Sequence, residues 1–297
     1  MSRAALLALP RARSQSPWAQ ALQRLRRNRM AVAAGLFLLA MAAASFAAPL
    51  LPGLPSPAAQ DLALGAAAPS AAHPLGTDLL GRDLLARMLY GGRISLLVGL
   101  LGMLVSLVIG VGYGAVAGYA GGRTDEWMMR GVDVLYSLPY LFLVILLLVF
   151  FSRSLVMLFV ALGAVQWLTM ARIVRGQVLS LRQQTFVEAA RALGAGPGTV
   201  VFRHLVPNTL GPVLVYATLT VPAVMLQEAF LSFLGLGVQP PGASWGTLVA
   251  DGAQVMGLFP WLVAFPGLAF SLTLFCFNFL GDGLRDALDP RESRGRH

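Results

Sequence analysis

Few side chains in this 297-residue sequence have types and spacings suited to chemistry. The three histidines, His73, His204 and His297, show no paired spacing typical of a metal site. The single cysteine, Cys276, excludes an intrachain disulfide and a thiolate metal cluster. All 22 basic residues are arginine, so the sequence has no phosphate-binding loop of the type that needs a lysine. We therefore expect no catalytic residue, no metal ligand and no nucleotide cofactor bound by this chain.

The acidic residue best placed for ion chemistry is Glu228, in the apolar stretch VMLQEAFLSF. A carboxyl group inside a membrane span usually faces the bundle interior or a water-filled path. Two roles therefore stay open: Glu228 lines a translocation pathway, or it forms a hydrogen bond between helices. Four charged residues alternate in sign near helical spacing, which predicts a salt-bridged external helix rather than a substrate site. They are Asp78, Arg82, Asp83 and Arg87.

Membrane-spanning helices must position these residues. The sequence is 57% hydrophobic and 12% charged, whereas soluble domains are about 25% charged. Crossing the bilayer takes about 20 apolar residues. The first such run follows a leader too long for a secretory signal and is predicted to be an uncleaved anchor. The sequence predicts an all-α membrane protein with six transmembrane helices, at 30–49, 94–119, 132–151, 154–173, 211–235 and 259–280.

The arginines orient these predicted spans. With the amino terminus inside, seven arginines precede the first span, two follow the second, five lie between the fourth and fifth, and four follow the last. Only Arg82, Arg87, Arg93 and Arg153 are then outside, so the positive-inside rule predicts that both termini are cytoplasmic. The predicted organisation is a basic leader 1–29, an anchor helix 30–49, an external connector and amphipathic segment 50–93, a five-helix core 94–281 and a cytoplasmic tail 282–297.

Two segments outside the spans are also distinctive. The leader places Trp18, Leu22 and Leu25 at helical spacing among arginines. It forms either a helix on an anionic lipid surface or a disordered basic tail. Between the first two spans, 49–74 is rich in proline and alanine and is predicted to be an external connector.

Glycines and prolines within the spans predict how the helices pack. Small residues at four-residue spacing let two helices approach closely in a membrane, whether the partner lies in this chain or another. Pro222 and Pro266 each remove a backbone donor and predict kinks in their helices. Such a kink either lines a pathway or serves only the packing of the helices. The glycines that share one face of the second span are Gly110, Gly114, Gly118 and Gly122.

The loop 174–210 joins the fourth and fifth spans on the predicted cytoplasmic side. Thr185 and Glu188 fit a T-x-x-E capping box, in which each side chain bonds a free amide of the first turn. Gly194 is a typical left-handed stop. The sequence therefore predicts a short helix at 186–193.

A second short helix is predicted from Pro197, through Phe202, until Pro207. Two short helices with small and apolar faces either lie on lipid or dock into a groove of a partner protein. No arginine cluster flanks the apolar face, which favours the protein partner. The residues predicted on this face of the first helix are Phe186, Ala189, Ala190 and Leu193.

The string EAARALGAGPGTVVFRHLVPN closely resembles the EAA loop of permease subunits in bacterial ABC importers. In that family the loop forms a coupling helix that fits a cleft on the ATPase subunit. The matching positions are Glu188, Ala189, Ala190, Gly194 and Val206-Pro207.

Two further strings resemble the C-type permease of the dipeptide, oligopeptide and nickel importers. They are HPLGTDLLGRDLLARMLYGGRISL at 73–96 and LSFLGLGVQPPGASWG at 231–246. The string GGRTDEWMMRGVDVLYSLP at 121–139 is similar to a second cytoplasmic contact of that subfamily. The resemblance covers nearly the whole chain and departs only around 58–72, in the connector.

The resemblance implies a multi-pass permease of the bacterial inner membrane, forming half of a translocation pathway for peptides or a related small solute, nickel included. It implies a homologous second permease, two ATPase subunits that hold ATP and Mg²⁺, an external substrate-binding protein and surrounding lipid, with no nucleic acid. Glu228 and Pro222 are expected at the pathway. The residues expected to couple to the ATPase are Thr185, Glu188, Ala189, Ala190, Leu193, Gly194, Phe202 and Pro207.

An ion-coupled secondary transporter that uses Glu228 is the alternative function. Such a protein would work without an ATPase and would show internal repeat symmetry, which this sequence does not display. A purely structural membrane anchor is disfavoured, because an anchor has no use for six spans with kinked helices.

Overall fold

The computed structural model describes residues 17–151 and 154–288, and these residues form helices and connecting loops with no β-strand. Five of the helices are long and apolar enough to cross a membrane, or six if one bent pair is a single span. The predicted all-α class is confirmed. The helices are α1 (Pro17–Arg27), α2 (Arg29–Ala47), α3 (Leu84–Val105), α4 (Val111–Ala120), α5 (Gly122–Ser137), α6 (Tyr140–Phe151), α7 (Leu155–Leu181), α8 (Thr185–Ala192), α9 (Pro197–Thr199), α10 (Val206–Phe233), α11 (Trp245–Gln254) and α12 (Trp261–Leu288).

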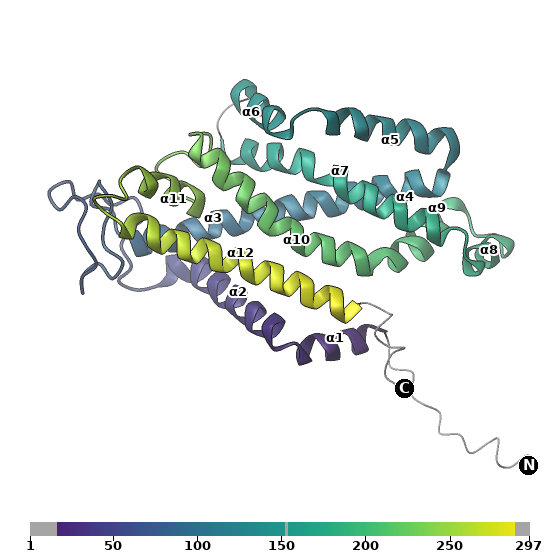
Figure 1. Ribbon diagram of the computed structural model, residues 1–297, viewed down its shortest axis with the longest axis horizontal. Coiled ribbons are helices and arrows are strands. Elements are labelled where there is room, and N and C mark those ends of the chain that lie inside the picture. Colours follow the sequence, from purple (N-terminus) through teal and green to yellow (C-terminus); the bar gives the residue numbers. More distant parts are fainter. Residues whose placement is uncertain (1–16, 152–153, 289–297) are drawn as a thin grey trace, which may run out of the picture.

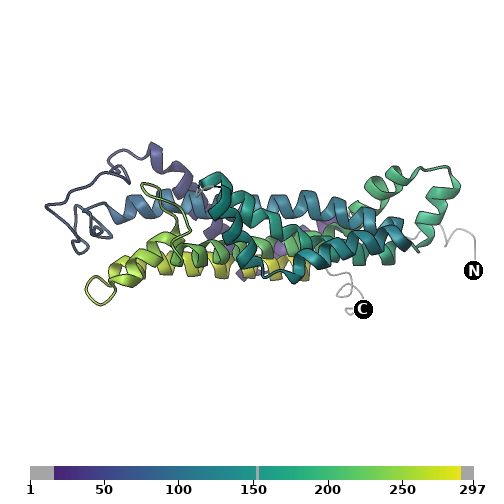
Figure 2. The same cartoon turned by 90° about the horizontal axis from the view of Figure 1, so that it is seen from above.

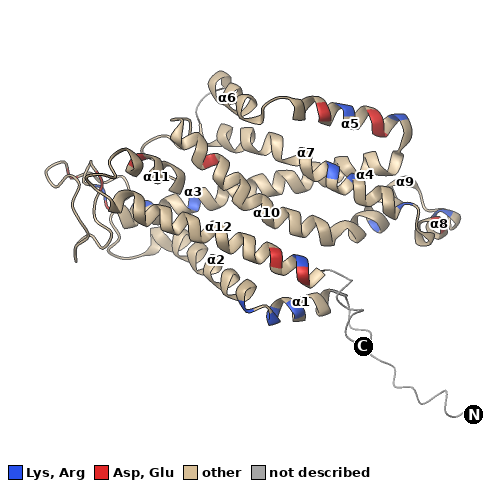
Figure 3. Ribbon diagram, viewed as in Figure 1, with Lys and Arg blue, Asp and Glu red and all other residues tan. Residues whose placement is uncertain are grey.

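The helices run mostly along one direction and separate two ends of the molecule. Figure 1 shows α1 and α8 at one end, and the long loop between α2 and α3 together with α11 at the other. Figure 2 shows the same separation in a perpendicular view. In Figure 3, α2 and α6 are drawn almost entirely without charge, whereas α1 and α5 carry many charged residues. The arginines at 1–16, 152–153 and 289–297 lie outside the described residues.

The second span begins earlier than hydropathy indicates. A continuous helix covers Leu84–Ala120, through α3, a π-helical turn and α4. Asp83 is its N-cap and accepts a hydrogen bond from the Ala86 amide at 2.8 Å. The predicted external helix through Asp78 and Arg82 is therefore wrong, because those residues form the turn that precedes the cap. Their predicted ion pair does form, at 2.7 Å.

The third span is broken rather than continuous. Helices α5 and α6 meet at an angle of 79° where a single helix at 132–151 was predicted. Leu138 is extended there, with φ −75° and ψ 132°. The ring of Pro139 disfavours a helical conformation at the preceding residue, which explains the break.

The fifth span is longer than predicted, because the short helix predicted to end at Pro207 continues directly into it. A helix of 37 residues covers Pro197–Phe233, through α9, a π-helical turn at Val200–Leu205 and α10. Pro207 lies in the first turn of α10, directly after the π-helical turn. A π-helical turn changes the hydrogen-bond register locally, so the missing donor of Pro207 interrupts no regular ladder.

Glycines of α4 and of the π-helical turn before it, Ser106–Gly110, pack closely against α7. An added Cβ on Gly110 would lie 2.6 Å from Cβ of Met170, and one on Gly118 would lie 2.9 Å from the carbonyl oxygen of Arg175. A Cβ on Gly114 would overlap the carbonyl of Ala171. The partner helix therefore lies within this chain. Gly122 does not share this face, because it begins α5 with φ +52°.

Candidate functional site

Helix α8 lies at the end of the molecule that also carries α1 (Figure 1). Its N-cap is Gln184, which is extended at φ −83° and ψ 147°, and no side chain caps the first turn. Thr185 is the first helical residue, so the predicted capping box with Glu188 is wrong. The T-x-x-E pattern is present, but the helix begins one residue earlier than the box requires.

The other end of α8 closes as its glycine predicts. Gly194 has φ +86°. The Gly194 amide donates to the carbonyl of Arg191 at 2.9 Å, and the Ala195 amide donates to the carbonyl of Ala190 at 3.0 Å. This pair of bonds is a Schellman motif, which satisfies carbonyls that the helix end would leave free. The predicted left-handed stop is confirmed.

One face of α8 is buried and another is exposed. Val187 and Ala190 are buried, and Val187 packs with Val200 and Leu205 of the following helix. On the predicted apolar face, Ala190 alone is buried. Phe186, Leu193 and Phe202 are 37%, 90% and 61% exposed. We call these three residues the apolar tip. Thr185, Glu188, Ala189 and Pro207 are also exposed.

Ion pairs and hydrogen bonds fix the helices next to the apolar tip. Arg175 of α7 binds the buried carboxylate of Asp125 with two bonds, at 2.5 and 2.6 Å. Arg182 donates to the carbonyl of Gly118 at 3.0 Å. The Arg191 guanidinium lies 5.0 Å from the ring centre of Tyr119. Sequence reasoning missed these contacts, although the acids of α5 and the arginines of α7 were visible as charges beside predicted spans.

Glu228 joins α10 to α11 by hydrogen bonds. Its side chain is fully buried, and its Oε1 accepts from Ser232 Oγ at 2.8 Å and from Ser244 Oγ at 2.6 Å. Ser244 is the N-cap of α11 and forms a reciprocal capping box with Thr247. These contacts match the helix-to-helix role left open above. Pro222 is buried inside α10. The pathway roles of Glu228 and Pro222 stay predictions.

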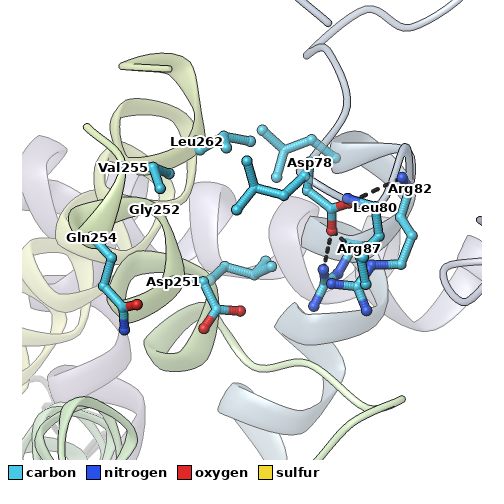
Figure 4. A pocket seen from close by; sticks show the side chains of 12 residues that line it. Asp78, Leu80, Arg82, Arg87, Asp251, Gly252, Gln254, Val255 and Leu262 are labelled. Carbon is cyan, nitrogen blue, oxygen red and sulfur yellow. Dashed lines mark hydrogen bonds and ion pairs between the residues drawn. The ribbon is translucent and has the colours of Figure 1, made fainter. Parts of the chain in front are cut away.

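The opposite end of the molecule holds a cavity of about 260 Å³ between the turn before α3 and α11 (Figure 4). Asp78 accepts hydrogen bonds from Arg82 Nε, at 2.7 Å, and from Arg87 Nη1. Burial opposes the ionisation of Asp78, but the nearby Arg87 charge and the hydrogen bonds from Arg82 outweigh it and lower its pKa. Asp251 lies on the other wall of the cavity.

The predicted connector is folded onto this end of the molecule. Thr77 Oγ1 donates to the carbonyl of Gly65 at 2.7 Å and accepts from the Ala67 amide at 2.8 Å. His73 Nδ1 lies 2.9 Å from Asp83 Oδ2. Among the described residues, no group of three or more histidine, cysteine or acidic side chains is arranged to hold a metal ion.

Two family comparisons cover most of the chain. Residues 16–69 match the family described as the N-terminal TM domain of oligopeptide transport permease C. Residues 110–294 match the family described as the binding-protein-dependent transport system inner membrane component. The chain belongs to this inner membrane component family. The permease resemblance in the sequence is thereby confirmed, and the secondary-transporter alternative is not favoured.

Curated relatives of this permease agree over nearly its full length. The oligopeptide transport system permease protein OppC of Escherichia coli (strain K12) is 50% identical over 280 residues, which are 94% of this chain and 92% of the relative. The glutathione transport system permease protein GsiD of Pectobacterium atrosepticum is 40% identical over 97% of both chains. With its several apolar helices, this permease is a multi-pass protein of the bacterial inner membrane.

Proposed function

We propose that this permease is one of two homologous membrane-spanning subunits of an ATP-driven importer for peptides or a related small solute. Both termini and the loop 174–210 face the cytoplasm, and the loop couples the permease to a separate ATPase. An external substrate-binding protein delivers the solute to the end with the 260 Å³ cavity. ATP and Mg²⁺ are held by the ATPase subunits, since this chain has no lysine for a phosphate-binding loop.

The apolar tip is the observation that carries this proposal. Leu193 and Phe202 are largely exposed, although α8 and the helix that follows it bury other apolar residues against each other, such as Val187 and Leu205. Covering a large apolar side chain stabilises a contact by about 1.5–3 kcal/mol. The tip therefore supports docking to a protein groove. Helix α1 carries a cluster of arginines, but no such cluster surrounds the apolar tip among the described residues. This difference disfavours lipid as the partner of the tip.

The solute class is supported by the relatives. The names of relatives describe transport of oligopeptides, dipeptides and glutathione, all of which contain amide-linked residues. We keep the division of the chain into leader, anchor helix, connector, core and tail, and change two of its boundaries. The external connector ends at the cap Asp83 instead of 93, and the last helix extends to Leu288, into the predicted tail.

Gly194→Asp tests the coupling proposal. Gly194 has φ +86°, so a side chain there strains the Schellman turn and tilts the apolar tip. We expect normal insertion and abundance, but at least a tenfold loss of solute uptake and weakened co-purification of the ATPase. Gly196→Ala is the matched control, because Gly196 has φ −68° and open space around its Cα. Wild-type uptake by Gly194→Asp at wild-type abundance would contradict the assignment.

Depletion of the ATPase partner separates the two transport mechanisms. Uptake through the proposed importer stops when the ATP-hydrolysing subunit is removed, and a proton or sodium gradient does not restore it. Uptake that continues without the ATPase, driven by such a gradient, would instead establish the secondary-transport alternative.

A further inference from the structure

A cavity of about 470 Å³ lies between the break that joins α5 to α6 and the helices α7 and α10. This volume is typical of small-molecule sites. Its lining includes no charged side chain. The polar groups are amides and hydroxyls, chiefly Gln166, Gln227, Tyr136, Thr169 and Tyr216. We call these five residues the neutral polar cluster.

Hydrogen bonds within the cluster use only part of its capacity. Gln166 Nε2 donates to Gln227 Oε1 at 2.6 Å, and the hydroxyls of Tyr136 and Thr169 lie 3.1 Å apart. The carbonyl oxygen of the Gln166 side chain and the Nε2 of Gln227 bond no other described residue. Side by side, the two amides therefore keep one acceptor and one donor group for a further partner.

Lipid is a poor partner for these groups. Gln166 and Thr169 lie near the middle of α7, so a hydrocarbon tail in the cavity would leave amide groups without hydrogen bonds. Each such group costs about 1–3 kcal/mol. Tyr136 and Ser137 are exposed on the adjoining end of α5. Polar groups at this depth are accommodated where they face protein or a water-filled path.

We propose that the neutral polar cluster contacts the translocated solute and binds a peptide through its main chain. The proposal rests on the function proposed above and names its substrate class. A peptide group has one N–H donor and one carbonyl acceptor, which complement the free acceptor of Gln166 and donor of Gln227. The lining itself carries no charge, and the Arg172 guanidinium, 4.1 Å from the ring centre of Tyr136, is paired with Asp133 at 2.7 Å. Peptides of different sequence therefore meet the same neutral contacts.

The same chemistry disfavours a free metal ion as the solute in contact with this site. Nickel is bound in proteins by imidazole and other nitrogen or oxygen ligands with preferred geometry. The lining of the cavity has no histidine, cysteine or carboxylate. A metal ion that crosses here would exchange its water shell for neutral amide and hydroxyl groups only, whereas a peptide group finds matched partners.

Uptake of two peptides by the reconstituted full complex tests the inference. The probes are trialanine and trialanine methylated on its central amide nitrogen, which removes one donor. The variants are Gln227→Met and Thr169→Val, which remove polar groups at similar volume. Gln177→Met is the matched control, because Gln177 lies on α7 outside the cluster, in a neighbouring cavity that shares only Tyr216 with it. The substrate-binding protein is identical throughout, so the ratio of variant to wild-type uptake for each peptide isolates the membrane step.

We expect both variants to lower trialanine uptake at least fivefold and uptake of the methylated peptide less than twofold, with Gln177→Met unchanged for both. Unchanged trialanine uptake in both variants, or an equal fall for both peptides, would overturn main-chain recognition. If Gln227→Met does not assemble, Thr169→Val alone decides. ATP-dependent uptake by the wild-type complex checks the proposed function separately, since its loss for every peptide would refute the importer rather than the site.

Discussion

Two buried acids in this permease are held in opposite ways. Asp78 is an ion-pair partner, bound by Arg82 and by the nearly fully buried Arg87. Glu228 meets no positive charge among the described residues and accepts two hydroxyl hydrogen bonds through one oxygen. Loss of a charge therefore has different consequences at the two positions.

Asp78→Asn is expected to destabilise the external end. It leaves the Arg87 guanidinium buried without its counter-charge, which costs on the order of 3 kcal/mol. Because the pKa of Asp78 is lowered in the folded state, its stabilising contribution is present above the ordinary pKa of an aspartate and is lost only as pH falls through the lower folded value. The thermal midpoint of the purified complex should fall for Asp78→Asn and stay constant for wild type near neutral pH.

Asp251→Asn is the matched control for that prediction. Asp251 lines the same cavity, but burial raises its pKa more than Arg87 and Arg82 lower it. Neutralising it removes an unfavourably placed charge, so the thermal midpoint should be unchanged or higher. A loss as large as that of Asp78→Asn would show that the cavity depends on total charge rather than on the Asp78 pairs.

Glu228→Gln is expected to keep transport and stability. The side-chain carbonyl oxygen of glutamine can accept the same bonds from Ser232 and Ser244. Glu228→Leu removes the acceptor of the hydroxyl protons of Ser232 and Ser244, at about 1–3 kcal/mol each. Abundance and ATP-dependent uptake of the two variants distinguish the roles. A Glu228→Gln protein that assembles normally but no longer transports would assign the carboxylate a direct part in the pathway.

At the scale of elements, hydropathy located the five helices long enough to cross a membrane and the bent pair α5 and α6 that would be a sixth span, but not the ends of the helices. Hydropathy placed the start of the second span at 94, although its helix begins at Leu84. Polar residues between 84 and 93, such as the buried Arg87, face other protein groups and lower the average hydropathy of this segment. The break at Pro139 lay inside an apolar run. Neither π-helical turn has a residue pattern that demands it.

The candidate site was predictable only where its contacts are local. The turn at Gly194 follows from the residue type, because glycine readily adopts a positive φ. The start of α8 depends on whether Gln184 or Thr185 takes the extended N-cap conformation, and the T-x-x-E pattern does not decide between them. The pair of Gln166 and Gln227 joins two helices far apart in the sequence, and no short motif predicts it.

Gly114→Ala is expected to separate α4 from α7. An added Cβ would overlap the backbone carbonyl of Ala171, which cannot move without the helix. Overpacking of this kind costs about 1–3 kcal/mol. Gly112→Ala on the same helix meets nothing within 4 Å and should be neutral or stabilising. Thermal unfolding of the two purified variants checks the difference, and equal midpoints would refute close packing through this face.

At the scale of the whole molecule, the fold separates two ends with different chemistry. One end carries the basic helix α1 and the apolar tip, and the other carries the folded connector and the charged cavity. Figure 1 and Figure 2 show the long helices running between these two ends, which lie at opposite extremes of the molecule. The orientation proposed from arginine placement therefore assigns each end to one side of the membrane.

Cysteine labelling tests that orientation. In a Cys276→Ser background, Gln23→Cys and Gln60→Cys place one thiol at an exposed position at each end of the molecule. A membrane-impermeant maleimide applied to spheroplasts should label Gln60→Cys alone, and lysis should make both reactive. Labelling of Gln23→Cys in intact spheroplasts would reverse the proposed topology.

The long helix Pro197–Phe233 has a mechanical consequence. It starts beside the apolar tip, and its far end carries Glu228, which is bonded to the cap of α11. At 1.5 Å per residue its 37 residues span about 55 Å, enough to cross the bilayer as one continuous helix. The π-helical turn at Val200–Leu205 and the inner prolines Pro212 and Pro222 are the points at which this helix can bend. A displacement of the tip would therefore reach the opposite face through a single helix, with any bending taken up at these three places.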